Sequence, residues 1–176
     1  MPSNNKRLNT QHTHYSYSRE SKSFPVQVVA QGVSSPANIG SLCRTMDAFG
    51  LRKLTLCDTH VDLNSSRFKR TARSTQEHIQ IVQNQDLKTV LNTLAAQNVH
   101  VVALELSANS KPLSALEFPK NKNIALLIGG EKHGLSQEAL NSVQATYFIP
   151  MYGNNSSMNV IQAAGIALYS CIQKLL

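Results

Sequence analysis

The stretch FIPMYGNNSSMNVIQAAGIALY (148–169) decides the fold of this chain. It starts with a short apolar run that ends at Ile149-Pro150 and continues through the polar segment GNNSS (153–157). From residue 156 to residue 176 the pattern predicts a helix with apolar residues around nearly its whole circumference. Such a helix is expected to be buried on all sides. Because a C-terminal helix usually lies at the surface, its outer face needs a cover from its own chain or from a second subunit.

Upstream of this stretch, short apolar runs alternate with helical patterns. Strands are expected at residues 26–31, 53–58, 78–82, 98–106, 123–129 and 145–150. Helices are expected at 37–49, near 64–74, and at 86–97, 136–143 and 156–176. Alternation of this kind predicts an α/β fold with a largely parallel sheet and helices on both of its faces.

Polar side chains gather at the start of the last helix. Ser156, Ser157 and Asn159 stand close together in the sequence, and capping of the helix is their ordinary role. Two serines and two asparagines nevertheless exceed what one cap requires. The excess predicts a polar pocket beside the free backbone N–H groups of the helix start.

A second motif, ALLIGGEKHGLSQEAL (125–140), runs from a buried strand into two adjacent glycines. Gly129-Gly130 after a strand lets the backbone approach a ligand closely, although a structural turn is the default reading. The spacing matches neither the GxxxxGK[ST] phosphate loop nor the GxGxxG dinucleotide motif. Glu131 is harder to explain structurally, because a turn between glycines needs no carboxylate.

A third motif, SPANIGSLCRTMDAFG (35–50), contains the first expected helix. Asn38 lies at its start, where asparagine can cap the helix or orient a ligand. Arg44 follows six positions later, and Phe49-Gly50 closes the helix with a glycine. Taken alone, Arg44 reads as an ordinary surface arginine.

Length and composition predict one globular domain. The chain has 176 residues, of which 41% are hydrophobic and 15% charged. We expect this domain over residues 24–176, preceded by a flexible basic tail over residues 1–23. No run of about 18 apolar residues occurs, and the N-terminus lacks the apolar segment of a secretory signal. No membrane association is therefore expected.

The cysteines and histidines show no metal-site spacing. Cys43, Cys57 and Cys171 are scattered and form no CxxC pair. Reduced thiols packed as small apolar side chains, in a cytoplasmic protein, are the expectation. The six histidines follow no ligand pattern either, so no metal is expected.

The charge balance favours a polyanionic partner. Lys and Arg number 17 against 10 Asp and Glu, which gives a net charge of +7, and phosphate contacts supply sequence-independent affinity for nucleic acids. A merely basic soluble surface explains the net charge equally well. One cluster without any acid predicts an RNA-binding patch, although a solvated helix face is the alternative: Arg67, Lys69, Arg70 and Arg73.

Together the three motifs resemble the SpoU/TrmH family of RNA 2′-O-ribose methyltransferases, within the SPOUT superfamily. The resemblance covers residues 26–176, and the motifs stand in the family's order. It implies a deep trefoil knot at the C-terminal end, a homodimer that covers the last helix, and S-adenosyl-L-methionine as the cofactor. The implied partner is RNA, either tRNA or rRNA, and the reaction is methylation of a ribose 2′-hydroxyl.

The resemblance also assigns roles to single residues. It implies catalytic or substrate-binding roles for Asn38, Arg44, Glu131, Ser157 and Asn159. It implies cofactor contacts at Leu104, Gly129, Gly130, Ile149 and Met158. Glu131 is expected to fix Arg44 or Asn38 through a hydrogen bond, or to accept a proton. Met158 stands where the family often has Leu, which keeps an apolar wall, and Gln162 is expected to hydrogen-bond inside the dimer or the site.

Two other function classes compete with this assignment. A non-catalytic RNA-binding module of the same fold explains the charge and the tail, but not Glu131, Ser157 and Asn159 together. A Rossmann-type enzyme with a nucleotide cofactor ranks behind it, because QGVSSPANIG (31–40) lacks GxGxxG after the first strand. Binding of adenosylmethionine discriminates the enzyme from the RNA-binding module.

Overall fold

One parallel sheet organises residues 22–119 and 121–176, which the computed structural model describes. Its strand order is β3-β2-β1-β6-β4-β7-β5, and each pair of neighbours is parallel. The strands are β1 (Val26–Gln31), β2 (Lys53–Cys57), β3 (Gln80–Gln85), β4 (His100–Leu104), β5 (Lys111–Pro112), β6 (Ile124–Gly129) and β7 (Ala145–Phe148). The helices are α1 (Pro36–Ala48), α2 (Ser66–Ala72), α3 (Leu87–Ala96), α4 (Gln137–Ser142) and α5 (Val160–Leu175), with short 3-10 turns η1 (Thr75–His78) and η2 (Leu113–Ala115).

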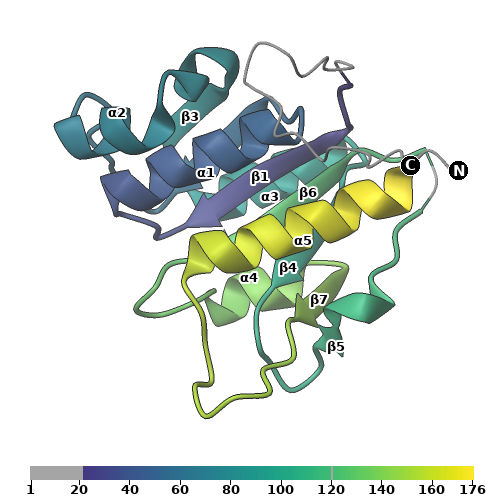
Figure 1. The fold of residues 1–176 in the computed structure, drawn as a ribbon. Coiled ribbons are helices and arrows are strands. Elements are labelled where there is room, and N and C mark those ends of the chain that lie inside the picture. Colours follow the sequence, from purple (N-terminus) through teal and green to yellow (C-terminus); the bar gives the residue numbers. More distant parts are fainter. Residues whose placement is uncertain (1–21, 120) are drawn as a thin grey trace, which may run out of the picture.

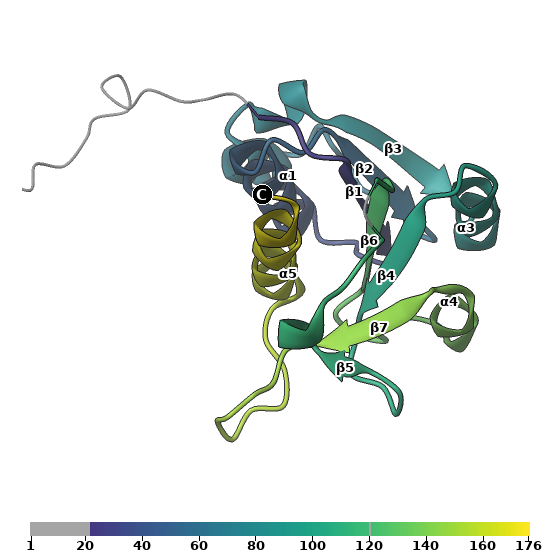
Figure 2. The ribbon, with the colours of Figure 1, turned by 90° about the vertical axis from the view of Figure 1, so that its right-hand side faces the viewer.

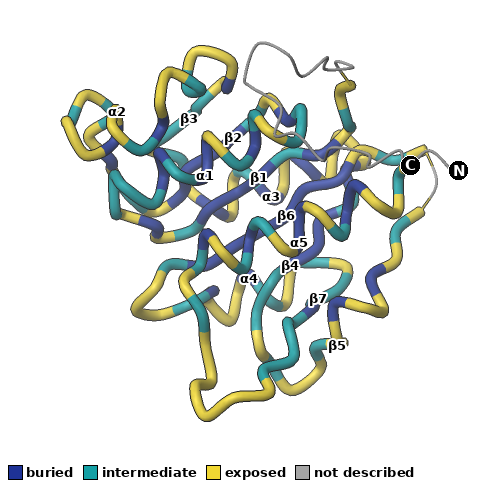
Figure 3. The backbone as a smooth tube through the Cα atoms, in the orientation of Figure 1, coloured by how far each residue is buried: buried dark blue, intermediate teal, exposed yellow. Residues whose placement is uncertain are grey.

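Helices cover both faces of this sheet, as the sequence predicts. Helices α1, α2 and α5 lie on one face, and α3 and α4 lie on the other (Figures 1 and 2). Alternate residues of each strand point to opposite faces. Val28 and Leu126 therefore join the core beneath α1 and α5, whereas Val29 and Leu127 join the core beneath α3. Figure 3 shows β1 and β6 buried at the centre of the molecule.

Several elements differ from the sequence expectation by a few residues, and three of the differences have a clear structural reason. Strand β3 starts at Gln80 because residues 75–78 form the turn η1. Strand β5 was not expected, since Lys111-Pro112 is exposed and too short for an apolar pattern. Helix α5 starts at Val160 instead of residue 156, because Asn159 caps it and the residues before it form an exposed loop.

Helix α2 packs directly on the first half of α1. A Cβ atom at Gly40 would lie 2.2 Å from Thr71 Oγ1 and 2.6 Å from the Phe68 carbonyl oxygen. Only glycine fits at such a contact. Gly40 therefore fixes the place of α2, and with it the basic cluster that α2 carries.

Helix α5 buries one face only. Ile161, Ala164 and Leu168 are buried against the sheet and α1, whereas Ile166 is 43% and Tyr169 55% exposed. The expectation of burial on all sides is wrong for the single chain, because the sheet covers only one side of the helix. Within the described residues, Ile166 and Tyr169 are thus exposed on the outer face of α5, together with the polar side chains of Gln162, Gln173 and Lys174.

Two expectations concern the ends of the chain and the membrane. The predicted tail falls almost entirely on residues 1–21, which lie outside the described residues, so the division at residue 23 stays a prediction. No helix in the described part of the chain is both long and apolar enough to cross a membrane.

Candidate active site

A cavity of about 1080 Å³ opens at the carboxyl ends of β4, β6 and β7. Parallel strands end at the same edge of a sheet, and ligands of open α/β folds bind beyond that edge. The loop that follows β7 and the start of α5 form the remaining walls. The lining includes each residue predicted to contact the cofactor: Leu104, Gly129, Gly130, Ile149 and Met158.

The adjacent glycines let three backbone segments meet beside this cavity. A Cβ atom at Gly129 would lie 2.3 Å from the carbonyl carbon of Gly134, and one at Gly130 would lie 2.5 Å from the carbonyl oxygen of Gly32. The turn is closed by Gly134 N–H, which donates to the Gly130 carbonyl at 2.9 Å. The glycines thus serve a tight protein turn, and both also line the cavity.

A hydrogen bond joins the helix α1 to this turn. Ser35 Oγ accepts the Asn38 backbone N–H at 3.4 Å, so Ser35 caps α1. The Asn38 side chain is left to donate to Glu131 Oε1. Of the alternatives for Glu131, the structure has the pairing with Asn38. Glu131 itself lines the cavity and is exposed.

The loop before α5 places two further predicted residues at the cavity. Asn159 Oδ1 accepts the Ile161 backbone N–H at 2.9 Å, so Asn159 performs the ordinary capping role. Ser157 is exposed, and its backbone N–H donates to Asn155 Oδ1 at 3.4 Å. Ser157, Asn159 and Gln162 all line the cavity. The Gln162 side chain is exposed there and forms no hydrogen bond with the described residues.

Arg44 does not join these residues. It is exposed on α1 and is not part of the cavity lining. Its neighbour Thr45 faces α5, where a Cβ atom at Gly165 would lie 3.6 Å from Thr45 Cγ2. Further along, the rings of Phe49 and Tyr169 are 6.4 Å apart. Arg44 is therefore exposed on the helix that packs beside α5, and it lies outside the cavity of its own chain.

Comparison with known proteins assigns the family. Residues 25–169 match the SpoU rRNA Methylase family. The chain belongs to this family. The resemblance of the three motifs is thereby confirmed, and membership also supports the trefoil knot.

Individual relatives agree with the SpoU assignment. The chain is 31% identical over 142 residues to the 23S rRNA (guanosine(2553)-2′-O)-methyltransferase RlmP of Bacillus subtilis, across 81% of this chain and 56% of that protein. A crystal structure of an AdoMet-bound rRNA methyltransferase from Sinorhizobium meliloti superposes with a TM-score of 0.80 at 29% identity, over 90% of this chain and 59% of that one. The chain thus spans little more than half the length of the curated relatives it matches.

A third match covers nearly a whole relative. A structure described as giving insights into the 2-OH methylation of C/U34 on tRNA has a TM-score of 0.74 and 28% identity, over 86% of this chain and 98% of that one. Proteins similar to this chain are therefore named for methylation of rRNA in some cases and of tRNA in another.

The basic cluster of this SpoU chain lies on and just after α2, apart from the cavity. Its residues are all exposed, and Arg73 closes the helix in a left-handed conformation. None of the four lines the cavity. We call this set the α2 cations: Arg67, Lys69, Arg70 and Arg73. A phosphate-binding patch and a solvated helix face both fit this placement.

Two polar residues at the carboxyl edge of the sheet were not predicted from the sequence. Gln31 Oε1 accepts the Ser136 N–H at 3.0 Å, while Gln31 Nε2 donates to Asp58 Oδ2 at 2.8 Å. Glu105 lines the cavity and accepts two backbone N–H groups. Their position in the sequence could have indicated them, because each is a polar residue at or directly after the carboxyl end of an apolar strand.

The cysteines are buried thiols, as expected. Burial raises the pKa of Cys43, Cys57 and Cys171 to about 12 in each case. They are neutral at physiological pH and poor nucleophiles, because the thiolate is the reactive form. Among the described residues, no three His, Cys, Asp or Glu side chains gather in a way that could hold a metal ion.

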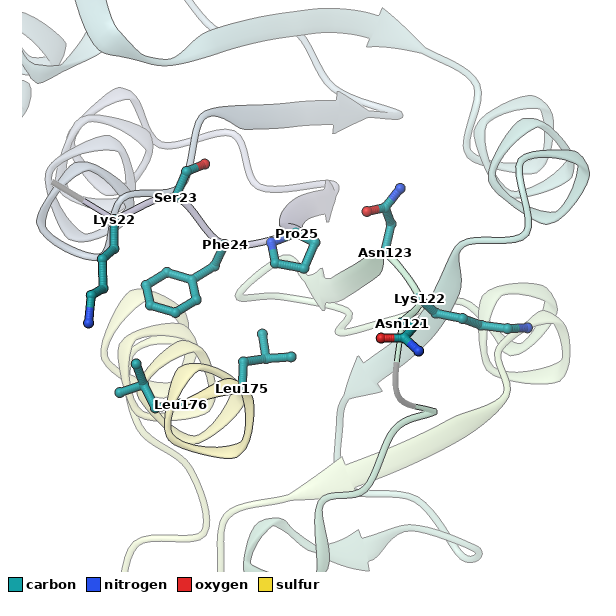
Figure 4. A pocket seen from close by; sticks show the side chains of 9 residues that line it. All are labelled: Lys22, Ser23, Phe24, Pro25, Asn121, Lys122, Asn123, Leu175 and Leu176. Atoms are coloured by element: carbon teal, nitrogen blue, oxygen red, sulfur yellow. The ribbon is translucent and has the colours of Figure 1, made fainter.

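A second cavity of about 560 Å³ lies at the opposite end of the sheet, between the start of β1 and the end of α5. Figure 4 shows Lys22 and Lys122 extending in opposite directions from its walls. Lys122 Nζ donates to Asn98 Oδ1 at 2.7 Å. The charged groups of this cavity do not converge, so it is not the candidate active site.

Proposed function

We propose that this protein is an S-adenosylmethionine-dependent methyltransferase that methylates a ribose 2′-hydroxyl of RNA. The observation that carries the proposal is the cavity of about 1080 Å³ at the carboxyl ends of β4, β6 and β7. Each predicted cofactor residue lines it, together with Glu131, Ser157 and Asn159. Family membership and the named activities of the relatives support the same conclusion.

The cavity fits the cofactor. Its volume of about 1080 Å³ accommodates a nucleoside with an amino-acid chain. Apolar side chains such as Leu104, Ile149 and Met158 alternate with backbone of the glycine turn, so apolar contacts and backbone hydrogen bonds are both available. When bound, the cofactor supplies an electrophilic methyl group on a positively charged sulfur.

The protein's own task is to position the ribose and stabilise charge. A ribose hydroxyl is a weak nucleophile, so alignment with the methyl group and stabilisation of the developing alkoxide contribute most of the acceleration. The Ser157 hydroxyl and the Asn159 amide orient the ribose. Glu131 holds Asn38 at the cavity rim. A guanidinium presents a planar set of N–H donors that matches the oxygens of a phosphate, so we assign Arg44 to the phosphate next to the reacting ribose.

We propose a homodimer in which Arg44 serves the cavity of the neighbouring subunit. The support is the exposure of Ile166 and Tyr169 on α5, the helix that packs beside α1. In a dimer with two-fold symmetry the same surface of each subunit meets its own copy. Co-expression of Arg44→Ala with Ser157→Ala tests this, because a mixed dimer with shared sites retains one intact site. Activity reappears under that arrangement, and it stays absent where each chain builds its own site.

The RNA class and the location complete the proposal. Relatives are named for 23S rRNA and for tRNA, so tRNA and rRNA are both proposed substrates. The α2 cations are the proposed phosphate contacts outside the cavity, and no metal is required. A cytoplasmic location is proposed because the three thiols are free and buried.

Calorimetric titration with adenosylmethionine and adenosylhomocysteine tests the proposed function. Binding of both ligands is the expected result. RNA binding without any cofactor binding would instead support the non-catalytic RNA-binding module of the same fold.

A further inference from the structure

Glu105 holds the end of the glycine turn against the end of β4. It directly follows Leu104, the last residue of that strand. Its Oε1 accepts the Leu106 backbone N–H, and its Oε2 accepts the Leu135 backbone N–H, each at 3.0 Å. One carboxylate therefore joins two segments that are 30 residues apart in the sequence.

The glycine turn closes on this carboxylate because residue 134 has no side chain. Gly134 has a φ of +60°, and a Cβ atom there would lie 2.4 Å from Glu105 Oε2. Gly134 in turn hydrogen-bonds to Gly130 and packs against Gly129. Glu105 thus holds the C-terminal end of the turn, at Gly134 and Leu135.

This turn is a wall of the cavity. Gly129, Gly130, Glu131 and Gly134 line it together with Glu105. Hydrogen bonds from backbone N–H groups to a carboxylate are stronger than those between neutral groups. These hydrogen bonds hold the turn in one conformation before a ligand binds, so less conformational entropy is lost on binding.

We propose that Glu105 is a positioning residue for the cofactor. It acts through the turn at Gly129–Gly134, which it holds in the binding shape. The inference rests on the proposed function, since it takes adenosylmethionine and adenosylhomocysteine as the ligands of the cavity.

The test compares Glu105→Gln and Glu105→Ala with the wild type. Glu77→Ala is the matched control, because Glu77 is exposed on η1 and does not line the cavity. Titration calorimetry with adenosylhomocysteine is expected to give a Kd on the order of tenfold higher for Glu105→Ala. Glu105→Gln keeps one acceptor oxygen, so its Kd is expected to lie between those of the wild type and Glu105→Ala. The Kd of Glu77→Ala is expected to match that of the wild type.

Two further readouts separate positioning from general stability. Amide hydrogen exchange is expected to accelerate locally, at Leu106 and Leu135, in Glu105→Ala. The loss of two hydrogen bonds is also expected to lower the midpoint of thermal unfolding of the ligand-free protein, by roughly 2–4 °C per kcal/mol lost. A double-mutant cycle with Gly134→Ala is expected to be non-additive, since the added methyl group meets Glu105 itself.

The outcomes that overturn the inference are distinct from failure of the proposed function. A wild type that binds neither ligand refutes the proposed function, and this inference falls with it. A wild type that binds, with unchanged Kd in both Glu105 variants, refutes the positioning role alone. If Glu105→Ala does not fold, the test rests on Glu105→Gln alone. An unchanged Kd of Glu105→Gln then refutes the positioning role.

Discussion

Asn159 combines a structural and a proposed functional role, and substitutions there separate the two. Its side-chain oxygen caps α5 by accepting the Ile161 N–H at 2.9 Å. Replacement by alanine removes this cap, which costs about 1 kcal/mol of stability. For a domain of this size the midpoint of thermal unfolding should drop by roughly 2–4 °C.

Asn159→Ser is the informative counterpart of Asn159→Ala. Serine is as good a helix cap as asparagine, so the unfolding midpoint is expected to return to that of the wild type. Serine lacks the amide N–H₂ group that we assign to the ribose. Methyl transfer to RNA should therefore stay at least about tenfold below the wild type in both variants, which corresponds to about 1.4 kcal/mol of transition-state stabilisation.

Differential scanning calorimetry and a radiolabelled methyl-transfer assay provide the two readouts. Ser157→Ala is the matched comparison, because Ser157 lines the cavity without capping the helix. It is expected to lose activity at an unchanged unfolding midpoint. Full activity of Asn159→Ser would refute the reasoning, since Asn159 would then act only as a cap.

Three further predictions concern the α2 cations, the α1–α2 contact and the buried thiols. Replacing the α2 cations by glutamine should weaken RNA binding and lower its salt-dependence slope by roughly one unit per lost phosphate contact, at an unchanged cofactor Kd; an unchanged RNA affinity in a binding titration would contradict this. Gly40→Ala should cost about 1–3 kcal/mol in denaturant unfolding, because the new methyl group meets Thr71 and the backbone of α2, whereas Gly153→Ala has open space and should cost far less. The three cysteine thiols have a pKa of about 12 when folded, raised from 9.0, so their stabilising contribution is complete below pH 9 and is lost as the pH rises toward 12. Alkylation at pH 8 should accordingly be slow in the native protein and fast in denaturant, and fast native alkylation would contradict the buried state.

Much of the fold could be read from the sequence because it depends on local patterns. The fully buried strand at Ile124–Gly129 reads as a continuous apolar run, and the first helix ends at Phe49-Gly50 as its glycine indicates. The start of α5 could not be predicted in the same way. Residues 156–159 have the composition of a helix start. In the structure they still belong to the loop that connects the end of β7 with α5 and lines the cavity.

The candidate site was predictable where motifs carry it and not where tertiary contacts do. Glu131 and Ser157 stand in recognisable motifs, and both line the cavity. Glu105 and Gln31 were missed because their role exists only once separate strands end at the same edge. Asn38 and Glu131 are 93 positions apart, so the sequence did not show whether Glu131 pairs with Asn38 or with Arg44.

Transfer of an isotopically labelled methyl group from adenosylmethionine to RNA is the direct test of ribose methylation by this protein. The purified protein is incubated with unmodified tRNA and rRNA, and the nucleosides are analysed by mass spectrometry. A labelled 2′-O-methylnucleoside is the expected product, and the label is expected to be lost when Ser157 is replaced by alanine. Label found on a base, or no label on either RNA by a protein that binds the cofactor, would contradict ribose methylation.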